Sequence, residues 1–439
     1  MKKYIIALTA LLGVCSPRVM AQNTDAVDAR QQIKENIYRS ASNYYAYPGP
    51  QQKKLTPAPK GYEPYYISHY GRHGSRYLVS RDDYDKAWKT LLRADSVGKL
   101  TDYGKDVLRR VVMLRNEADH RRGELTLLGA EQHRGIAHRM YERFPQVFKG
   151  KTNIDAKSTI VIRCILSMEN ALQELKSINP QLVIRHDASE HDMWYMNNER
   201  QPQLFRKRWN DDLRNVMSQY RKRHANYDRL MQRLFNDTAY VNHEVNAENL
   251  NYHLFKLASN LQSSELRHSI SLYDLFNEQE VYDNWMIENA NWYVTHGPCP
   301  LNGGLQPFSQ RFLLGVILHE ADSCLALPHP GATLRFGHET CVMPLTCLLE
   351  LNNFGKQITD FERLPEIGWV NYMVFPMGAN IQFIFYKPKK GKGDILMKVL
   401  LNENEARLPL TPVSGPYYRW TDFRDYFTKK LASFKEENL

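Results

Sequence analysis

The sequence predicts an α/β protein in which a central, mostly parallel sheet is flanked by helices and a helical domain is inserted into the chain. Apolar runs of strand length alternate with amphipathic helical stretches in the first and last parts of the chain. Between about residues 190 and 300, long polar helical patterns rich in Asn, Tyr, Arg and Trp replace this alternation. We therefore expect a core formed by residues 22–189 and 301–439, with residues 190–300 as a helical cap.

The first 21 residues have the three parts of a secretory signal peptide. A basic start precedes a short apolar run over residues 4–14, and Ala21 offers a small residue at the expected cleavage site. The run is too short to span a bilayer as a helix, and no later segment is apolar enough to do so. We expect a soluble protein exported to the periplasm or secreted. Lipidation of Cys15 is the alternative to cleavage after Ala21, although Val14 is an unfavourable residue before a lipidated cysteine.

Composition and charge narrow the class of protein only partly. The chain has 439 residues, of which 43% are hydrophobic, so it can bury a large core and is not a disordered protein. Its net charge of +10 suits a partner that is nucleic acid, an anionic surface or a polyphosphorylated small molecule. Five cysteines would remain after cleavage, so at least one is free, and no C-x-x-C pair indicates a zinc ribbon or a thioredoxin-like site.

Secondary structure in the first core segment follows from periodicity and from turn residues. Ile33 and Ile37 lie at helical spacing, and two Pro-rich stretches within residues 48–59 then predict a loop. We expect a helix over 22–48, a strand at 65–70, and helical segments at 81–118 and 129–143. Strands at 158–163 and 182–185 follow, joined by a helix.

The second core segment contains three further strands and a final helix. A strand is expected at 332–336, and two strand-like runs at 381–386 and 395–400 flank a Lys/Gly/Pro turn, which predicts a hairpin. Thr421 is a candidate N-cap for a helix that continues to about residue 434.

A charged cluster follows the first strand directly, in the sequence Arg72-His73-Gly74-Ser75-Arg76. Two arginines beside a histidine can bind a phosphate dianion, and their positive charge opposes protonation of the imidazole. A neutral ring nitrogen that faces a bound phosphoryl group is a nucleophile. Gly74 allows the chain to curl around the anion, because glycine reaches backbone conformations that other residues do not.

This pentapeptide resembles the signature of the histidine phosphatase superfamily, in its acid phosphatase and phytase branch. The mutase-like branch usually has Glu or Gln after the glycine, where this chain has Ser75 and then Arg76. Tyr77-Leu78 departs from the x-Pro that often follows. The resemblance implies a phosphoglycerate-mutase-like core with a helical cap, a phosphohistidine on His73, and no metal or other cofactor.

Two more segments resemble the same family. Leu125-Thr126-Leu127-Leu128-Gly129 is similar to its Leu-Thr-x-x-Gly turn before a helix. Arg163, which we expect at the end of a strand, is followed four residues later by Ser167, a spacing that supplies another phosphate ligand in the family. The resemblance implies that Arg72, Arg76 and Arg163 hold the phosphoryl oxygens.

The dipeptide His338-Glu339 follows a strand and a glycine and precedes a helical stretch. It resembles the second motif of the family, which is His-Asp in most acid phosphatases and phytases and His-Ala-Glu in inositol polyphosphate phosphatases. His338 would then donate to a phosphoryl oxygen, and Glu339 would protonate the leaving oxygen. This chain has the glutamate of the second pattern but the spacing of the first, with no residue between His338 and the acid. The sequence therefore leaves open whether Glu339 reaches the leaving oxygen.

We therefore expect an exported phosphatase, monomeric, whose partner is a small phosphoester, with inositol polyphosphates including phytate as the best substrate class. The basic stretch at 206–233 either contacts such a substrate or forms a solvated helix face. Alternatives are a broad acid phosphatase for sugar or nucleotide phosphates, and a binding protein that retains the fold. A nucleic-acid partner is disfavoured because no binding motif accompanies the charge. A zinc site on His69 and His73 is disfavoured, because their spacing suits a helix and this segment is predicted to be a strand. The chain also has no P-loop motif, so a nucleotide site of that kind is not predicted.

Overall fold

The computed structural model describes residues 27–47, 52–197 and 201–435. The expected signal peptide and Cys15 therefore lie outside the described residues. Among the residues described, no helix combines the length and the apolar character that crossing a membrane requires. The five remaining cysteines are all free thiols.

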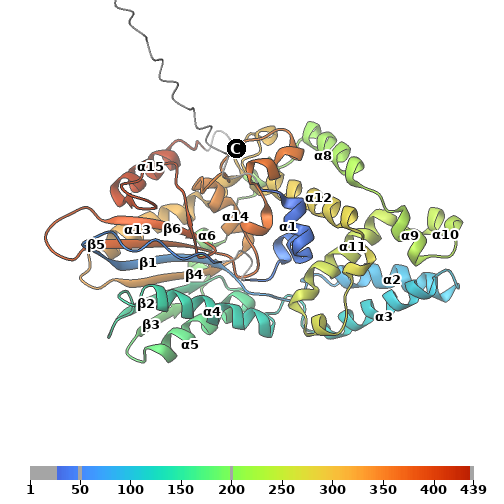
Figure 1. Ribbon diagram of the computed structural model, residues 1–439, viewed down its shortest axis with the longest axis horizontal. Coiled ribbons are helices and arrows are strands. Elements are labelled where there is room, and N and C mark those ends of the chain that lie inside the picture. The colour runs from blue at the N-terminus through green and yellow to red at the C-terminus, as the bar shows by residue number, and fades with distance from the viewer. Residues whose placement is uncertain (1–26, 48–51, 198–200, 436–439) are drawn as a thin grey trace, which may run out of the picture.

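Within the described residues, eight strands form one sheet with helices on both faces (Figure 1). The strand order is β3-β2-β4-β1-β5-β6-β7, and β8 pairs with β6. The strands are β1 (Tyr62–Arg72), β2 (Asn153–Ser158), β3 (Val183–Asp187), β4 (Gly331–Gly337), β5 (Asn380–Pro388), β6 (Leu396–Leu401), β7 (Asn404–Ala406) and β8 (Tyr418–Arg419). The predicted α/β class is confirmed, and so are the strand near residue 334 and the hairpin.

The sheet is mixed, whereas a mostly parallel sheet was expected. Strands β3, β2, β4 and β1 are parallel to one another, but β5 to β8 all pair antiparallel. Short connections explain the antiparallel pairs β5–β6 and β6–β7, because a parallel pair needs a crossover of a dozen or more residues. The antiparallel pair of β1 and β5 joins segments far apart in the chain, so the length of a connection does not set its direction.

Two layers of helices cover the sheet (Figure 1). Helices α4 and α5 lie on one face, and α13, α14 and α15 lie on the other. Their bounds are α4 Leu127–Arg143, α5 Ile162–Ile178, α13 Arg311–Leu325, α14 Glu339–Leu348 and α15 Trp420–Ala432. Successive residues of each strand point to opposite faces of the sheet, so they pack against different helix layers. Ile67 and Ile384 pack toward α4 and α5, and Tyr66 and Phe385 pack toward the opposite layer.

A second region beside the sheet is helical, as Figure 1 shows. In it α11 packs against α2, and α9 packs against α3, so residues 82–117 contribute to this region together with the expected insertion. Its helices are α2 (Asp82–Ser96), α3 (Asp102–Glu117), α8 (Asp211–His224), α9 (Asp228–Leu234), α10 (Thr238–Glu244), α11 (Ala247–Asn260) and α12 (Glu278–His296). The short helices α6 (Met193–Met196) and α7 (Pro202–Arg206) precede α8.

The strand expected at 158–163 is wrong. Strand β2 ends at Ser158, and helix α5 begins at Ile162, so Arg163 lies in the first turn of a helix and not at the end of a strand. The β-branched run that suggested a strand forms the turn between them, with Ile160 48% and Ile162 67% exposed. Strand β2 itself alternates buried and more exposed residues and is largely polar, so it lacks the continuous apolar run that the prediction relied on.

Two helix predictions also need correction. The single helix expected at 22–48 is interrupted at Asn36, whose extended backbone separates α1 (Ala29–Glu35) from the 3₁₀ helix η1 (Ile37–Tyr44). Thr421 does not cap the last helix, because α15 already begins at Trp420 and its N-cap is Arg419.

Gly331 starts β4 in a left-handed conformation, with φ of +72°, against the backbone of β2. A Cβ there would lie 1.9 Å from the Asn153 carbonyl oxygen, so Gly331→Ala should lower the free energy of unfolding by more than about 2 kcal/mol. Gly315→Ala is the matched control, because helix α13 leaves open space at that position. It should raise the stability by about 0.5–1 kcal/mol. Urea unfolding measures both, and equal effects would contradict this view of β4.

Candidate active site

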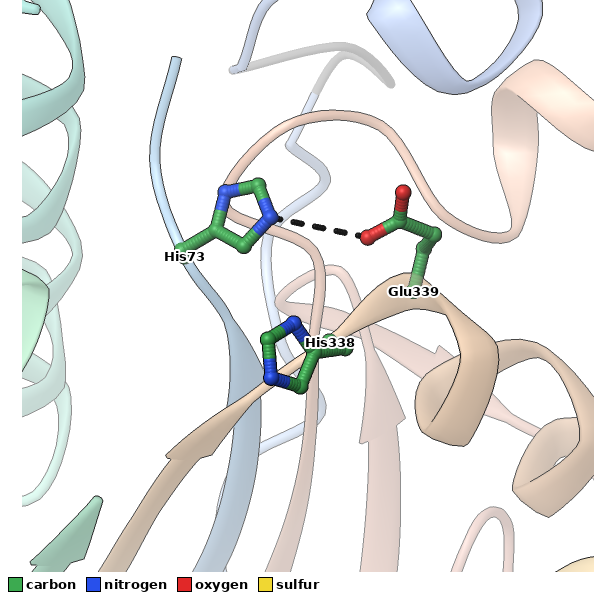
Figure 2. A group of neighbouring side chains, drawn as sticks. All are labelled: His73, His338 and Glu339. Atoms are coloured by element: carbon green, nitrogen blue, oxygen red, sulfur yellow. Dashed lines mark ion pairs between the residues drawn. The ribbon is translucent and has the colours of Figure 1, made fainter. Parts of the chain in front are cut away.

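The register of the parallel strands β1 and β4 brings two histidines together. Arg72 pairs with Gly337, so His73 and His338 leave the sheet side by side at the carboxyl ends of the strands. The His73 backbone N–H donates to the Gly337 carbonyl at 2.9 Å. The ring centroids of the histidines are 5.8 Å apart (Figure 2). Ligands of open α/β sheets commonly bind at this edge.

The loop after β1 is held against the starts of α4 and α5. A Cβ on Gly74 would lie 2.4 Å from the Gly129 carbonyl oxygen, so only glycine allows this approach. Thr126 caps α4 by accepting from the Gly129 N–H, which is the turn that the sequence indicated. The Gly74 N–H donates to Ser167 Oγ at 3.1 Å. Ser167 therefore positions the loop.

The tautomer of His73 follows from its hydrogen bond. Nδ1 lies 2.9 Å from the Gly74 carbonyl oxygen, which can only accept, so Nδ1 carries the proton and Nε2 has the lone pair. Burial holds the pKa of His73 well below its usual range, and Arg72 and Arg163 lower it further, while Glu339 opposes them. His73 is therefore a neutral imidazole whose Nε2 has a free lone pair.

Two guanidinium groups converge on the same point. Arg72 is fully buried, and its Nη1 donates to the Phe375 and Asn43 carbonyls. Its Nε lies 3.0 Å from Glu339 Oε2, and Arg76 Nη2 lies 3.9 Å from Glu339 Oε1. Burial lowers the pKa of Arg72 to about 10, so this buried guanidinium group is still a cation at neutral pH. Among the described residues, Arg72 Nη2 has no hydrogen-bond partner, which leaves a donor for an anion.

Glu339 is the first residue of α14, and its carboxylate lies between the two arginines and His73. Oε2 is 3.6 Å from His73 Nε2, and a dashed line marks this contact in Figure 2. Burial alone would raise the pKa of Glu339, but the charges of Arg72 and Arg76 outweigh it and hold that pKa well below its usual range. The side chain is therefore an ionised carboxylate, which a phosphate could replace between the arginines.

His338 and Arg163 complete the group that the sequence singled out. Burial lowers the pKa of His338 to about 4, so this ring is neutral too, and its Nε2 lies 3.2 Å from Thr159 Oγ1. Arg163 reaches the Gly123 carbonyl with Nη1 at 3.5 Å. Its charge is close enough to lower the pKa values of both histidines. The structure thus brings all six predicted site residues to one edge of the sheet.

His73, His338 and Glu339 offer ligand atoms within 4.8 Å of one another, a spacing that could hold a metal ion. The guanidinium groups of Arg72 and Arg76 lie against the same carboxylate, and their charge favours an anion over a cation. Together with a neutral imidazole, these groups can stabilise a phosphoryl group and attack its phosphorus.

Sequence reasoning missed Asn43 and Gln132. Asn43 contacts Arg72 through its carbonyl, and its Nδ2 lies 3.5 Å from Glu339 Oε1. Gln132 accepts from the Ser75 N–H at 2.8 Å and thereby fixes the loop. Neither belongs to a motif, and their positions in η1 and α4 have no signal that distinguishes them from ordinary polar residues.

Comparisons with known proteins agree on one family and one fold. Residues 71–402 match the sequence model of the histidine phosphatase superfamily (branch 2). The multiple inositol polyphosphate phosphatase of Bifidobacterium longum, solved with inositol hexasulfate, is 18% identical, with 89% of this chain and 97% of that chain covered and a TM-score of 0.71.

Two phytase structures are similar as well. The phytase from D. castellii is 14% identical, with 96% and 91% of the two chains covered and a TM-score of 0.66. The Hafnia alvei phytase, solved with myo-inositol hexakis sulphate, is 12% identical, with 87% and 99% covered and a TM-score of 0.54. At these identities the likeness shows a shared fold. No curated protein matches the sequence.

The buried neutral histidines predict a loss of stability in acid. Burial lowers the pKa of His69 to about 3 and those of His133 and His338 to about 4. Below about pH 6.5 the unfolded chain binds the protons that the folded protein refuses. The free energy of unfolding should then fall from pH 6.5 to about pH 4, by about 1.4 kcal/mol per pH unit for each group.

Urea unfolding at pH 7, 6 and 5 measures this slope. A variant His133→Gln should show a shallower slope, and His243→Gln, which changes an exposed histidine of α10, should not. A stability that is constant or rising toward pH 5 would contradict the assignment of these rings as neutral.

Proposed function

This chain belongs to the histidine phosphatase superfamily (branch 2), and from that premise we propose that it hydrolyses phosphomonoesters through a phosphohistidine on His73. The observation that carries the proposal is the neutral Nε2 of His73, which faces the carboxylate of Glu339 across a space bordered by two buried guanidinium groups. A nucleophile, an acid and a cationic anion site are the three parts that phosphoryl transfer requires.

In the first step, His73 Nε2 attacks phosphorus, and the bond from phosphorus to the ester oxygen breaks. Glu339 gives its proton to the departing oxygen, so that an alcohol leaves. The positive charges of Arg72, Arg76 and Arg163, with a hydrogen bond from His338, hold the non-bridging oxygens. In the second step, Glu339 takes a proton from water, the water oxygen bonds to phosphorus, and the bond to Nε2 breaks. Inorganic phosphate and neutral His73 result.

Glu339 must carry a proton in the first step, although it is ionised in the free site. A phosphate that enters between Arg72 and Arg76 takes over their attraction and adds its own negative charge beside the carboxylate. Both effects raise the pKa of Glu339 in the complex. Substrate binding itself therefore prepares the acid, and acidic conditions favour it. The adjacent His-Glu spacing does not keep Glu339 from the nucleophile, since the two groups are 3.6 Å apart.

For the substrate class, we propose inositol polyphosphates, including phytate. Structural neighbours named as an inositol polyphosphate phosphatase and as phytases support this, and two of them hold inositol sulfates. Part of the basic stretch remains exposed for such a substrate on α8, although Arg229 is held by Glu280. The proposal includes export after cleavage near Ala21, a monomeric state and no metal cofactor. A broad phosphatase for sugar or nucleotide phosphates is the second candidate, since the same site serves any phosphomonoester.

The test is phosphate release, in the presence of a chelator, from an inositol phosphate and from an aryl phosphate. Glu339→Gln should lower kcat on the inositol phosphate by about a hundredfold to ten thousandfold, because an alkoxide leaves poorly without a proton. The loss on the aryl phosphate should be much smaller, because an aryl oxide needs little protonation. His73→Ala should abolish both activities while the thermal melting curve shows a folded protein.

Equal losses on the two esters in Glu339→Gln would mean that another residue is the acid. Turnover by His73→Ala near that of the unchanged protein would overturn the phosphohistidine mechanism. A protein that binds phosphate esters and hydrolyses none of them would instead be a binding protein with this fold.

A further inference from the structure

A cavity of about 670 Å³ lies in the helical region next to the catalytic group. Residues of η1, α8, α11 and α12 line it. Two residues connect it to the active site. Asn43 lines the cavity and also contacts Arg72 and Glu339, and Tyr44 lines it while its ring lies 5.6 Å from the Arg76 guanidinium carbon. The cavity and the catalytic group are therefore neighbours that share Asn43 and Tyr44 as their border.

We propose that this cavity binds the body of the substrate, and that the body is a cyclic polyol with few phosphates besides the one transferred. The inference rests on the proposed phosphatase function and ranks the esters that the enzyme would accept, with phytate as a poorer substrate than less phosphorylated inositols. Within phosphate esters of inositols and sugars, it favours monophosphates and bisphosphates over a fully phosphorylated ring.

The lining has the hydrogen-bonding character of a polyol site. Six asparagines contribute to it: Asn43, Asn246, Asn249, Asn251, Asn284 and Asn291. An asparagine amide both donates and accepts, and so does each hydroxyl of a polyol, so the two match without any charge. Asn251 and Asn284 are bound to each other, and Asn246 caps α11. Among the described residues, the side-chain amides of Asn249 and Asn291 have no hydrogen-bond partner, so they are available to a ligand.

The charges of the lining argue against a densely phosphorylated body. Arg221 and Lys256 are balanced by Glu248 and Glu288. Lys256 is already committed, because its Nζ lies 2.6 Å from Asp83. Arg221 is exposed, and across the described residues it forms no ion pair, so it can meet one further phosphate. Additional phosphates in this cavity would face the two carboxylates at a cost in free energy.

Aromatic rings complete the match. Tyr44, Tyr252 and Trp292 line the cavity. They offer apolar faces against which the C–H faces of a six-membered polyol ring can pack, while the asparagines meet its hydroxyls. Small-molecule sites commonly combine apolar walls with a few convergent polar groups in this way.

The experiment measures kcat/KM for four substrates: an aryl phosphate, myo-inositol monophosphate, an inositol bisphosphate and inositol hexakisphosphate. Asn249→Leu and Asn291→Leu remove the amides with little change in volume. Each should lower kcat/KM for the inositol monophosphate about tenfold more than for the aryl phosphate. Asn242→Leu changes an exposed asparagine of α10 outside the cavity, and it should affect all four substrates alike.

Arg221→Gln separates the charge from the polyol contacts. It should lower kcat/KM for the bisphosphate about tenfold relative to that for the monophosphate, because it removes the cation that meets the second phosphate. In the unchanged protein, kcat/KM for the monophosphate or bisphosphate should exceed that for the hexakisphosphate.

A higher kcat/KM for the hexakisphosphate, or equal losses on aryl and inositol esters in both asparagine variants, would overturn the assignment of the cavity while hydrolysis itself stands. The absence of turnover on all four esters would overturn the proposed function, and the inference with it. Aryl phosphate turnover and thermal melting of each variant show that it is folded.

Discussion

The ion pair between Arg72 and Glu339 is the interaction on which the rest of the site depends. A fully buried guanidinium group is costly without a charged partner, and Glu339 is that partner at 3.0 Å. The pair keeps the carboxylate ionised beside His73. It also holds two cations at a point where a phosphate can replace the carboxylate. The free protein thus keeps its anion site assembled by filling it with one of its own side chains.

The sheet and the helical region contribute different parts of the site. Parallel pairing of β1 and β4 sets His73 beside His338, and the start of α14 then delivers Glu339. The loop at this edge is held against α4 and α5 through Gly129 and Ser167. The helical region contributes the neighbouring cavity, to which we assign the selection among esters. Burial keeps the histidines neutral, but it also reduces the stability that the protein can have in acid.

Much of this could be predicted from the sequence, because the signals are local. The pentapeptide at 72–76 follows an apolar strand, and His338 follows another, so parallel strands were enough to place them together. Arg163 reached the site although its strand prediction was wrong, because a turn and the first turn of a helix occupy the place of the expected strand end. The antiparallel pairing of β1 with β5 and the contact of Asn43 with Glu339 depend on tertiary structure. No local pattern encodes them. The catalytic roles of the site residues stay predictions.

The central claim is tested most directly by trapping the covalent intermediate. The protein is mixed with an ester carrying labelled phosphate, quenched within milliseconds in alkali, digested and mapped, since a phosphorus–nitrogen bond survives alkali and breaks in acid. The account predicts label on the peptide containing His73, stable in alkali, lost in acid, and absent in His73→Ala. Label on another residue, or hydrolysis at full rate with no labelled protein at any quench time, would contradict it.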